Sequence, residues 1–537
     1  MSNSPEWLTG DSLIQFKKSS LPGETPYDAF HRVARGNTKL FDYLWKGWIG
    51  LSTPVLANFN TDRGLPISCF SSVAEDSLDG IFETGHEIAR LTKNGGGTAV
   101  DISDLRGRGS PIRGYGESNG VIAWCKLYDV ITDKVRQGNV RRGALAIYLD
   151  SDHSDIDEFL RIRRPEGDPR NQCLDVHHGV KFSNSFMNRL EEGDLRSRNI
   201  WEVVLKTRLE TGEPYIFFSD NANADVSLPG KPDYTVRASN LCNEIYLHSD
   251  KDHTFVCCLS SLNLAKYDEW KDTDVVDVVI ELLDDVMEEF IVKAKVIPGM
   301  EKAIRFAESS RALGLGVMGF HTLLQSKRLA YGSKEAFKLN HLIFKQLKEQ
   351  SYEASRRLGA SRGVPRWAEG TGRRNTHTIA VAPTYSNSIV MGFVSEGINL
   401  IPANAYLHRS SQGSFIKVNK ELKEMGILSE QDWESVVAHK GSIQHLDLDP
   451  EVKKIFLTAR EINQLDHINM AGVRQQFIDQ GQSLNIFCSY DVPKNVFNQW
   501  HLTAWRLGLK GLYYVRASSA SKGDMVNYSS DCSACEA

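Results

Sequence analysis

The chain has 537 residues, of which 41% are hydrophobic and 24% are charged, a balance typical of soluble globular proteins. Its formal net charge of -5 argues against electrostatic binding to nucleic acid or to an anionic membrane. The N-terminus lacks the charged start and apolar run of a signal peptide, and no apolar stretch is long enough to span a bilayer. We therefore expect a cytoplasmic protein that acts on small molecules.

Helix-like and strand-like segments alternate along most of the chain. Apolar residues recur with helical spacing in four segments, and three short apolar runs have the pattern of buried strands. This alternation favours an α/β protein with mostly parallel strands. The predicted helices are 81–93, 121–136, 275–295 and 334–358, and the predicted strands are 143–150, 378–383 and 511–516.

The last stretch of the chain, residues 517–537, is rich in Ser, Ala and Asp and is predicted to be a flexible tail. It carries Cys532 and Cys535, a CxxC pair that can carry reducing equivalents by closing to a disulfide. The nine cysteines are widely spaced, which in a cytosolic chain indicates reduced thiols. Because no second CxxC pair accompanies the first, we do not expect a zinc site or any other metal in this chain.

The segment Asn240-Leu-Cys242-Asn-Glu244 combines a thiol with an amide and a carboxylate. In an extended segment, alternation would turn Asn240, Cys242 and Glu244 to one side. The carboxylate would then suit general base catalysis on a substrate hydroxyl, and the amide would hold that hydroxyl. The alternative is a buried structural cysteine between two polar surface groups.

Two adjacent tyrosines, Tyr513 and Tyr514, precede the tail. A tyrosine pair can pass an oxidising equivalent, because a phenol loses an electron and a proton together. Together with Cys242 and the terminal dithiol, the pair suggests that a cysteine is oxidised to a radical and that thiols supply electrons afterwards.

Cys69 and Cys257 are candidates for a pair of reducing thiols. If they meet across a pocket, they can deliver two electrons and form a disulfide. The alternative is two unrelated core cysteines, since buried cysteine is common.

Three loop segments have the composition of phosphate or nucleotide sites. Residues 93–98 contain three glycines around Gly95, and residues 382–388 contain several hydroxyl groups after a predicted strand. Both would suit an anion held by backbone N–H groups, and both equally suit a turn with a helix cap. Residues 137–143 combine Gln137 and Arg141 with glycines, which indicates either nucleotide contacts or a solvated loop.

The motifs SPIRG, QGNVRRG, NLCNEI, CLSSLNL, APTYSNS, LYY and CSAC occur in this order. As a set they resemble the catalytic subunit of class I ribonucleotide reductase, from about residue 50 to the C-terminus. The resemblance implies a ten-stranded α/β barrel of two five-stranded parallel halves, with a central finger loop that carries the radical cysteine. It also implies reduction of ribonucleotides, with ribonucleoside diphosphates as substrates, to 2′-deoxyribonucleotides for DNA synthesis.

The resemblance assigns a role to each residue of the candidate centre. Cys242 would become a thiyl radical and abstract the ribose 3′ hydrogen, while Glu244 would deprotonate the 3′ hydroxyl and Asn240 would hydrogen-bond there. Cys69 and Cys257 would supply two electrons.

Cys532 and Cys535 would then reduce that disulfide and be re-reduced by thioredoxin or glutaredoxin. Register against the segment Leu-Ser-Ser-Leu-Asn263 favours Cys257 over its neighbour Cys258.

Tyr513 and Tyr514 would relay the oxidising equivalent into Cys242 from a second protein, a ferritin-like small subunit with a metal site. The main alternative is an adenosylcobalamin-dependent, class II reductase, which makes its radical beside the substrate and needs no relay. A third interpretation is a non-catalytic, nucleotide-binding relative. The candidate radical cysteine, base and reducing thiols are all present, which argues against it.

The resemblance also implies nucleotide sites. A specificity site for dNTP or ATP effectors is expected at the interface of a homodimer, and Tyr385 departs from the family's more usual Gly or Glu beside the phosphates. Effector contacts are expected from Asp76, Arg106, Gln137 and Arg141, and substrate phosphates are expected around Thr53, Ser68, Gly95, Thr384, Ser386, Asn387 and Ser388.

Three parts of the chain are expected from the positions of the motifs. Residues 1–50 are a short N-terminal helical segment, residues 51–516 are the catalytic barrel with its specificity site, and residues 517–537 are the redox tail. The first segment is too short for the family's ATP-cone, so we expect no control of overall activity by ATP and dATP at such a domain.

Overall fold

A computed structural model describes most of the chain. The predicted site residues Ser68, Gln137, Arg141, Cys532 and Cys535 lie outside the described residues. None of the helices within the described residues is both long enough and apolar enough to cross a membrane. The described residues are 3–67, 69–114, 116–135, 143–164, 168–224, 228–410 and 413–518, without the side chains of 408–415.

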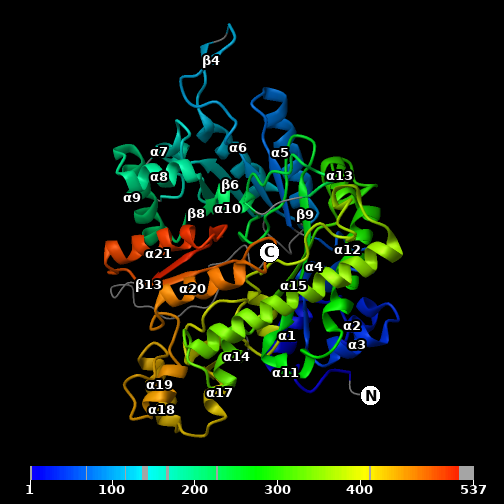
Figure 1. Cartoon of the computed structure of the whole chain (residues 1–537), viewed down its shortest axis with the longest axis vertical. Helices are drawn as coiled ribbons and strands as arrows, with labels where there is room; N and C mark the ends of the chain where they lie inside the picture. The colour runs from blue at the N-terminus through cyan, green and yellow to red at the C-terminus, as the bar shows by residue number, and fades with distance from the viewer. Residues whose placement is uncertain are drawn as a thin grey trace.

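The first half of a barrel is a run of parallel strands joined by helical connections. The third strand, residues 145–150, and the fourth strand, residues 177–182, are buried along nearly their whole length. The third is almost entirely apolar, as is usual for a parallel strand covered on both faces, whereas the fourth buries His177, His178 and Lys181. Its strands in the described residues are, in spatial order, β2 (Cys69–Val73), β3 (Gly97–Asp101), β6 (Leu145–Asp150), β7 (His177–Phe182) and β8 (Tyr215–Phe218). The connections include α5 (Leu78–Lys93), α6 (Val121–Lys134), α7 (Ile156–Phe159), α8 (Asn184–Glu192), α9 (Leu195–Thr211) and the projecting hairpin of β4 (Pro111–Ile112) and β5 (Gly116–Glu117), seen at the top of Figure 1.

The second half begins with β9 (Phe255–Asn263), which pairs in parallel with β10 (Leu313–Met318). Two parallel bridges, Leu315 to Ile379 and Val381 to Gln482, continue this half, so the predicted strand 378–383 is present only as isolated pairs. Next come β13 (Ile486–Ser489) and its parallel partner β15 (Val515–Ser518). Its helices are α10 (Ser219–Asn223), α11 (Tyr267–Trp270), α12 (Val275–Ala294), α13 (Glu301–Ser310), α14 (Phe320–Ser326), α15 (Lys334–Arg362), α16 (Tyr385–Val390), α20 (Gln464–Gln475) and α21 (Lys494–Arg506).

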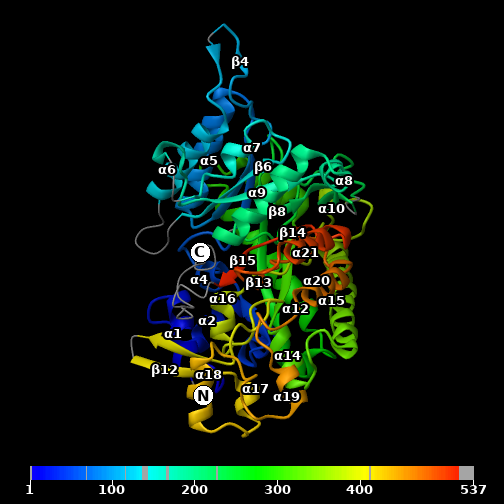
Figure 2. The ribbon, with the colours of Figure 1, turned by 90° about the vertical axis from the view of Figure 1, so that its left-hand side faces the viewer.

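Antiparallel pairs join the two halves on both sides. Strand β2 pairs with β9 on one side, and β14 (Gly511–Leu512) pairs with β8 on the other. Figure 2 shows β13, β14 and β15 between the upper and lower parts of the molecule. Because β2 runs opposite to β9 and β8 runs opposite to β14, the two parallel halves run in opposite directions.

A loop between the two halves projects from α10 toward β9. An antiparallel bridge between Val236 and His248 closes its base. The tip contacts both halves, because Tyr148 of β6 donates to the Asn240 carbonyl at 3.2 Å and the Gly481 N–H donates to the Glu244 carbonyl at 2.9 Å. We call residues 237–247 the finger loop, since they lie between the two halves of the barrel.

Three helices precede the barrel, α1 (Gly10–Ser19), α2 (Pro26–Ala34) and α3 (Thr38–Trp45). The next strand, β1 (Ile49–Leu51), pairs antiparallel with β9, and α4 (Thr53–Asn58) follows it. The expected boundary at residue 50 therefore falls inside a strand that belongs to the sheet.

A small subdomain with its own apolar core lies below the barrel in Figure 1. Buried Leu422, Val436, Ile443 and Phe456 form this core, separately from the main one. Its elements are β11 (Ala405–Ser410), β12 (Gly413–Val418), α17 (Lys420–Lys423), α18 (Glu430–Ala438) and α19 (Pro450–Ile455).

Candidate active site

The tip of the finger loop is a turn rather than an extended segment. The Asn240 Oδ1 accepts hydrogen bonds from the N–H groups of Glu244 at 3.0 Å and Ile245 at 3.1 Å. Asn243 has a φ of 62°, in the left-handed region that asparagine tolerates. The expectation of an extended, alternating segment was therefore wrong, because the Asn240 side chain closes a turn onto the backbone ahead of it.

The turn nevertheless brings the predicted polar groups together. The Asn240 Nδ2 donates to Glu244 Oε1 at 2.9 Å and lies 3.9 Å from the Cys69 Sγ. Ser483 donates to Glu244 Oε2 at 3.1 Å and to the Cys242 carbonyl at 2.6 Å. Burial raises the pKa of Glu244 to about 7. A carboxyl group with a pKa near neutrality suits a general base.

Cys69 and Cys257 are directly opposite each other in the antiparallel pairing of β2 with β9. Opposed residues in such a ladder have Cα atoms about 4.5–5.5 Å apart, within the range of about 4.4–6.8 Å that a disulfide needs. Neither forms a disulfide in this structure. Burial raises the pKa of the Cys257 thiol well above its ordinary value, so the resting thiol stays protonated.

Strand alternation separates Cys257 from its neighbour Cys258. The Cys258 Sγ lies 3.3 Å from the Leu283 carbonyl of α12, on the outer side of β9. The Cys257 Sγ lies 4.0 Å from the Gln480 Nε2 and faces away from that helix. Only Cys257 is therefore placed to pair with Cys69.

The two tyrosines form a continuous path to the finger loop. The Tyr513 hydroxyl hydrogen-bonds with both the Cys242 thiol and the Tyr514 side chain. The two tyrosine rings have centroids 4.2 Å apart. Burial raises the pKa of Tyr513 well above its ordinary value, so the phenol stays protonated and can lose its proton together with an electron.

A buried group of polar side chains surrounds the outer tyrosine. The Tyr215 hydroxyl donates to the Tyr514 oxygen at 2.9 Å, and the His177 Nδ1 lies 3.3 Å from that oxygen and 2.6 Å from Glu213. Burial alone would raise the pKa of Glu213, but His177 and Arg163 hold it well below its ordinary value. Tyr514 therefore lies in a hydrogen-bonded group of Tyr215, His177 and an ionised Glu213 that fixes its hydroxyl in place.

The family model described as "Ribonucleotide reductase, barrel domain" matches residues 67–196, 192–369 and 366–515. These segments span the finger loop, both cysteine strands and the tyrosine pair. The chain belongs to the ribonucleotide reductase large-subunit family. This family match confirms the resemblance stated from the motifs and the barrel fold expected from it.

Individual reductases agree with the family match. A Frog virus 3 protein provisionally named as a ribonucleoside-diphosphate reductase large subunit is 37% identical over 527 residues, covering 93% of this chain and 92% of the relative. The large subunit of Invertebrate iridescent virus 3 is 33% identical, with 93% and 92% covered. The solved class Id alpha subunit of Actinobacillus ureae is 39% identical, with a TM-score of 0.89 and with 96% of this chain and 98% of that chain covered.

The residues expected near substrate phosphates of this reductase come from three places. Thr53 is the first residue of α4, and Thr384, with a φ of 51°, immediately precedes α16. The Thr384 Oγ1 accepts the Gly397 N–H at 2.8 Å, and the Ser388 hydroxyl donates to the Tyr385 carbonyl at 2.7 Å. The side chains of Thr384 and Ser388 therefore stabilise the turn that leads into α16. Ser386 and Asn387 lie within the same helix.

Gly95 belongs to the C-terminal cap of α5. Its N–H donates to the Thr92 carbonyl at 3.0 Å, and the Gly96 N–H donates to the Leu91 carbonyl at 2.9 Å. A φ of 88° at Gly95 is typical of a glycine that ends a helix. The backbone donors of this glycine run are therefore engaged in the cap, and contact of Gly95 with a substrate stays a prediction.

The two described residues of the expected effector site contact each other. The Arg106 Nε donates to Asp76 Oδ2 at 2.9 Å, and its Nη1 donates to the Pro111 carbonyl of β4 at 3.1 Å. About a third of each side chain is exposed, 38% for Arg106 and 33% for Asp76. The pair thus joins the end of β2 to the projecting hairpin at the surface of the reductase.

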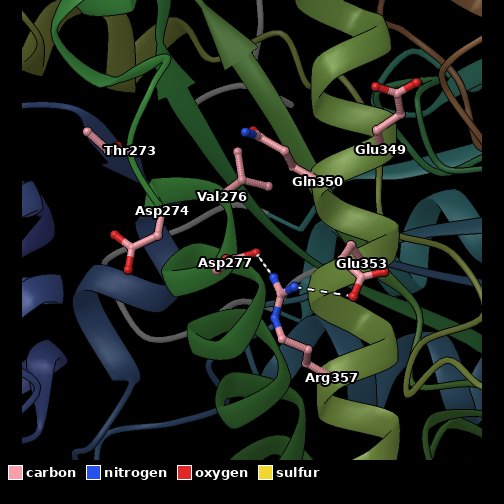
Figure 3. A pocket seen from close by; sticks show the side chains of 8 residues that line it. All are labelled: Thr273, Asp274, Val276, Asp277, Glu349, Gln350, Glu353 and Arg357. Carbon is pink, nitrogen blue, oxygen red and sulfur yellow. Dashed lines mark hydrogen bonds and ion pairs between the residues drawn. The ribbon is translucent and has the colours of Figure 1, made fainter.

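A surface pocket between α12 and α15 is distinct from this centre (Figure 3). Arg357 contacts both Asp277 and Glu353 within the pocket, while Asp274 and Glu349 pair with lysines outside its lining. The pocket includes none of the predicted site residues. Its lining consists of Thr273, Asp274, Val276, Asp277, Glu349, Gln350, Glu353 and Arg357.

The sequence interpretation missed several residues of the centre. Ser483 reaches the finger loop across 241 positions of the chain, and Tyr215 reaches Tyr514 across 299. Neither belongs to a motif with a chemical signature, and periodicity marks Tyr215 only as one apolar residue of a buried strand. His177 and Glu213 were missed because they too lie outside any motif with a chemical signature.

Proposed function

We propose that this reductase converts ribonucleoside diphosphates to 2′-deoxyribonucleotides through a thiyl radical on Cys242. The observation that carries the proposal is the hydrogen bond between Tyr513 and Cys242, in a loop whose next polar groups are Asn240 and Glu244. The reducing pair, Cys69 and Cys257, lies at the same centre, because Asn240 approaches Cys69.

In the proposed reaction, a hole passes from Tyr514 to Tyr513 and then to Cys242. The Cys242 thiyl takes the ribose 3′ hydrogen atom, and Glu244 takes the proton of the 3′ hydroxyl. The 2′ hydroxyl then leaves as water with a thiol proton.

Cys69 and Cys257 supply two electrons and two protons in total and become a disulfide. Glu244 returns its proton to the 3′ oxygen, and Cys242 returns a hydrogen atom to C3′ and regains the radical. The balance is one ribonucleotide and two thiols giving one deoxyribonucleotide, one disulfide and one water.

The tyrosine path implies a partner protein that oxidises Tyr514. We infer a ferritin-like small subunit whose metal site generates the oxidant, so that the metal belongs to the partner rather than to this chain. The solved relative is described as a class Id alpha subunit, a name that itself implies a second kind of subunit. After turnover, Cys532 and Cys535 would reduce the disulfide between Cys69 and Cys257, with thioredoxin or glutaredoxin as the final donor.

We further infer a homodimer with effector sites at its interface. Leu78 and Phe82 of α5 and Val130 of α6 are large apolar residues exposed by 66%, 54% and 46%. Exposed apolar side chains gathered on two packed helices are typical of a protein interface. The nearby Asp76 and Arg106, with Gln137 and Arg141, would bind the dNTP or ATP effector.

A turnover assay with a ribonucleoside diphosphate, with and without a small subunit and with and without adenosylcobalamin, tests the proposal. Turnover should require the small subunit, and adenosylcobalamin alone should give none. Cys242→Ser should stay inactive with dithiothreitol present, whereas the control Cys258→Ser should remain active. Cobalamin-driven turnover without a partner, or a Cys242→Ser enzyme rescued by dithiothreitol, would overturn the proposal.

A further inference from the structure

A group of two histidines and an aspartate lies at the base of the finger loop. The His248 Nε2 is 2.9 Å from one carboxylate oxygen of Asp250, and the His253 Nδ1 is 2.9 Å from the other. The three candidate ligand atoms all lie within 4.8 Å of one another. None of these residues belongs to the centre described above, because they follow the finger loop and precede β9.

The His248 ring is held so that its Nε2 faces the group in either tautomer. Its Nδ1 lies 2.9 Å from the Thr235 carbonyl and also 2.9 Å from the Thr235 N–H. The ring can therefore donate to the carbonyl through Nδ1 and leave the Nε2 lone pair available, or accept from the N–H and keep a proton on Nε2. A backbone partner for the second ring nitrogen is the usual support of a metal-binding histidine.

Asp250 is also fixed in place. The Asp252 N–H donates to its Oδ1 at 2.8 Å. His248 and His253 each hydrogen-bond to a different oxygen of the same carboxylate. The carboxylate is thus oriented before any ligand arrives.

The spacing of the three groups is close to that of a metal site. Zinc bonds to nitrogen and carboxylate oxygen measure about 2.0–2.2 Å, so tetrahedral ligands lie roughly 3.3 Å apart. The two hydrogen-bonded separations of 2.9 Å, each to a different oxygen of Asp250, would have to widen by a few tenths of an ångström. Separations within the group that approach its limit of 4.8 Å would have to shorten by up to about 1.5 Å, which a small rotation of the side chains can supply. Two imidazoles and one carboxylate leave the fourth position open for water, a ligand set common for zinc.

The group is shielded on one side and reachable on the other. The Trp367 ring covers both imidazoles, with centroids 5.5 Å from His248 and 5.0 Å from His253. The side chain of Asp250 is 34% exposed and that of His253 is 20% exposed, whereas that of His248 is 4% exposed. An ion can therefore enter past Asp250 and His253 and reach the buried imidazole.

We propose that His248, Asp250 and His253 bind one divalent transition-metal ion of the zinc type. The ion would join His248, which forms the bridge that closes the base of the finger loop, to the turn that precedes β9. Strand β9 carries Cys257. It would act as a structural clamp at the stem of the finger loop. The site neither takes part in the radical path nor depends on the function proposed above.

Titration of the full-length chain with Co²⁺ tests this site, because cobalt replaces zinc and its visible absorption reports the ligands. The protein carries Cys532→Ser and Cys535→Ser, which removes the dithiol that would compete for the ion. We expect one cobalt per chain, with d–d bands typical of nitrogen and oxygen ligands and no thiolate charge-transfer band. Asp250→Asn and His253→Gln should each weaken binding by at least tenfold.

The matched control is His445→Gln, since His445 stacks on His439 in the small subdomain, where the described structure gives no third ligand. This variant should bind cobalt like the parent. Unchanged affinity in the Asp250 and His253 variants would overturn the site. If those variants fail to fold, the spectrum of the parent protein decides the question. A parent spectrum without bands of nitrogen- and oxygen-ligated cobalt would show that the three side chains form only an ion-paired cluster.

Discussion

Glu244→Gln should remove the group that accepts the proton of the 3′ hydroxyl while keeping the finger loop closed. The amide can still accept from Asn240, and the Ser483 hydroxyl can rotate to accept from the new NH₂ group, so both contacts of Glu244 have a replacement. General base catalysis contributes roughly 10²–10⁴-fold. We therefore expect kcat/KM for a ribonucleoside diphosphate to fall by about that factor.

The pH profile gives the more specific part of this prediction. Because burial raises the pKa of Glu244 to about 7, the parent enzyme loses its base as the pH falls through neutrality. Its kcat/KM should drop about tenfold between pH 8 and pH 6. The residual activity of Glu244→Gln should show no such acid limb.

Stability should change with pH in the opposite sense to activity. The pKa of Glu244 rises on folding from 4.5 to about 7, so the folded state prefers the protonated carboxyl. A shift of about 2.5 units corresponds to about 3 kcal/mol. That stabilisation is present below pH 4.5 and is lost as the pH rises through 7. The Tm of Glu244→Gln should therefore fall less than the parent's between pH 5 and pH 8.

The assay is kcat/KM from pH 5.5 to pH 9 with saturating small subunit, together with thermal melting of both proteins. Glu87→Gln is the matched control, because burial also raises the pKa of Glu87, which pairs with Thr254 and lies on α5 outside the centre. This control should keep the acid limb. An unchanged limb in Glu244→Gln, or its loss in Glu87→Gln, would refute the assignment of the base.

Three further predictions concern the relay and the thiols. Tyr514→Phe should abolish turnover with the small subunit while nucleotide binding, measured by calorimetry, survives; normal turnover would remove Tyr514 from the path. In a single turnover without external reductant, mass spectrometry of the oxidised peptides should find the disulfide in Cys258→Ser but not in Cys257→Ser, and the reverse result would exchange the two cysteines. Loss of Cys532 or Cys535 should stop thioredoxin-driven turnover but leave dithiothreitol-driven turnover intact. Loss of dithiothreitol-driven turnover as well would show that the tail has another role.

The family and the chemistry were readable from residue types and their order. NLCNEI, LYY and the terminal CxxC supply the thiol, the phenol pair and the dithiol of the proposed radical mechanism, because each of these chemistries needs particular side chains. Long helices were also predictable: residues 334–358 form the larger part of α15, since its apolar positions keep one face over many turns. The short strand at 378–383 was less predictable, because in the structure only two isolated bridges form there.

Contacts between distant parts of the chain were decided only by the tertiary structure. The turn at Asn240, the opposition of Cys69 to Cys257 and the contact of Ser483 with the finger loop depend on strand register and barrel closure, which local periodicity does not encode. The group around His248 shows the same limit, since its residues form no familiar motif and only the fold turns their donor atoms toward one point. Sequence alone therefore determined which chemical groups this reductase carries, and folding determined which of them meet.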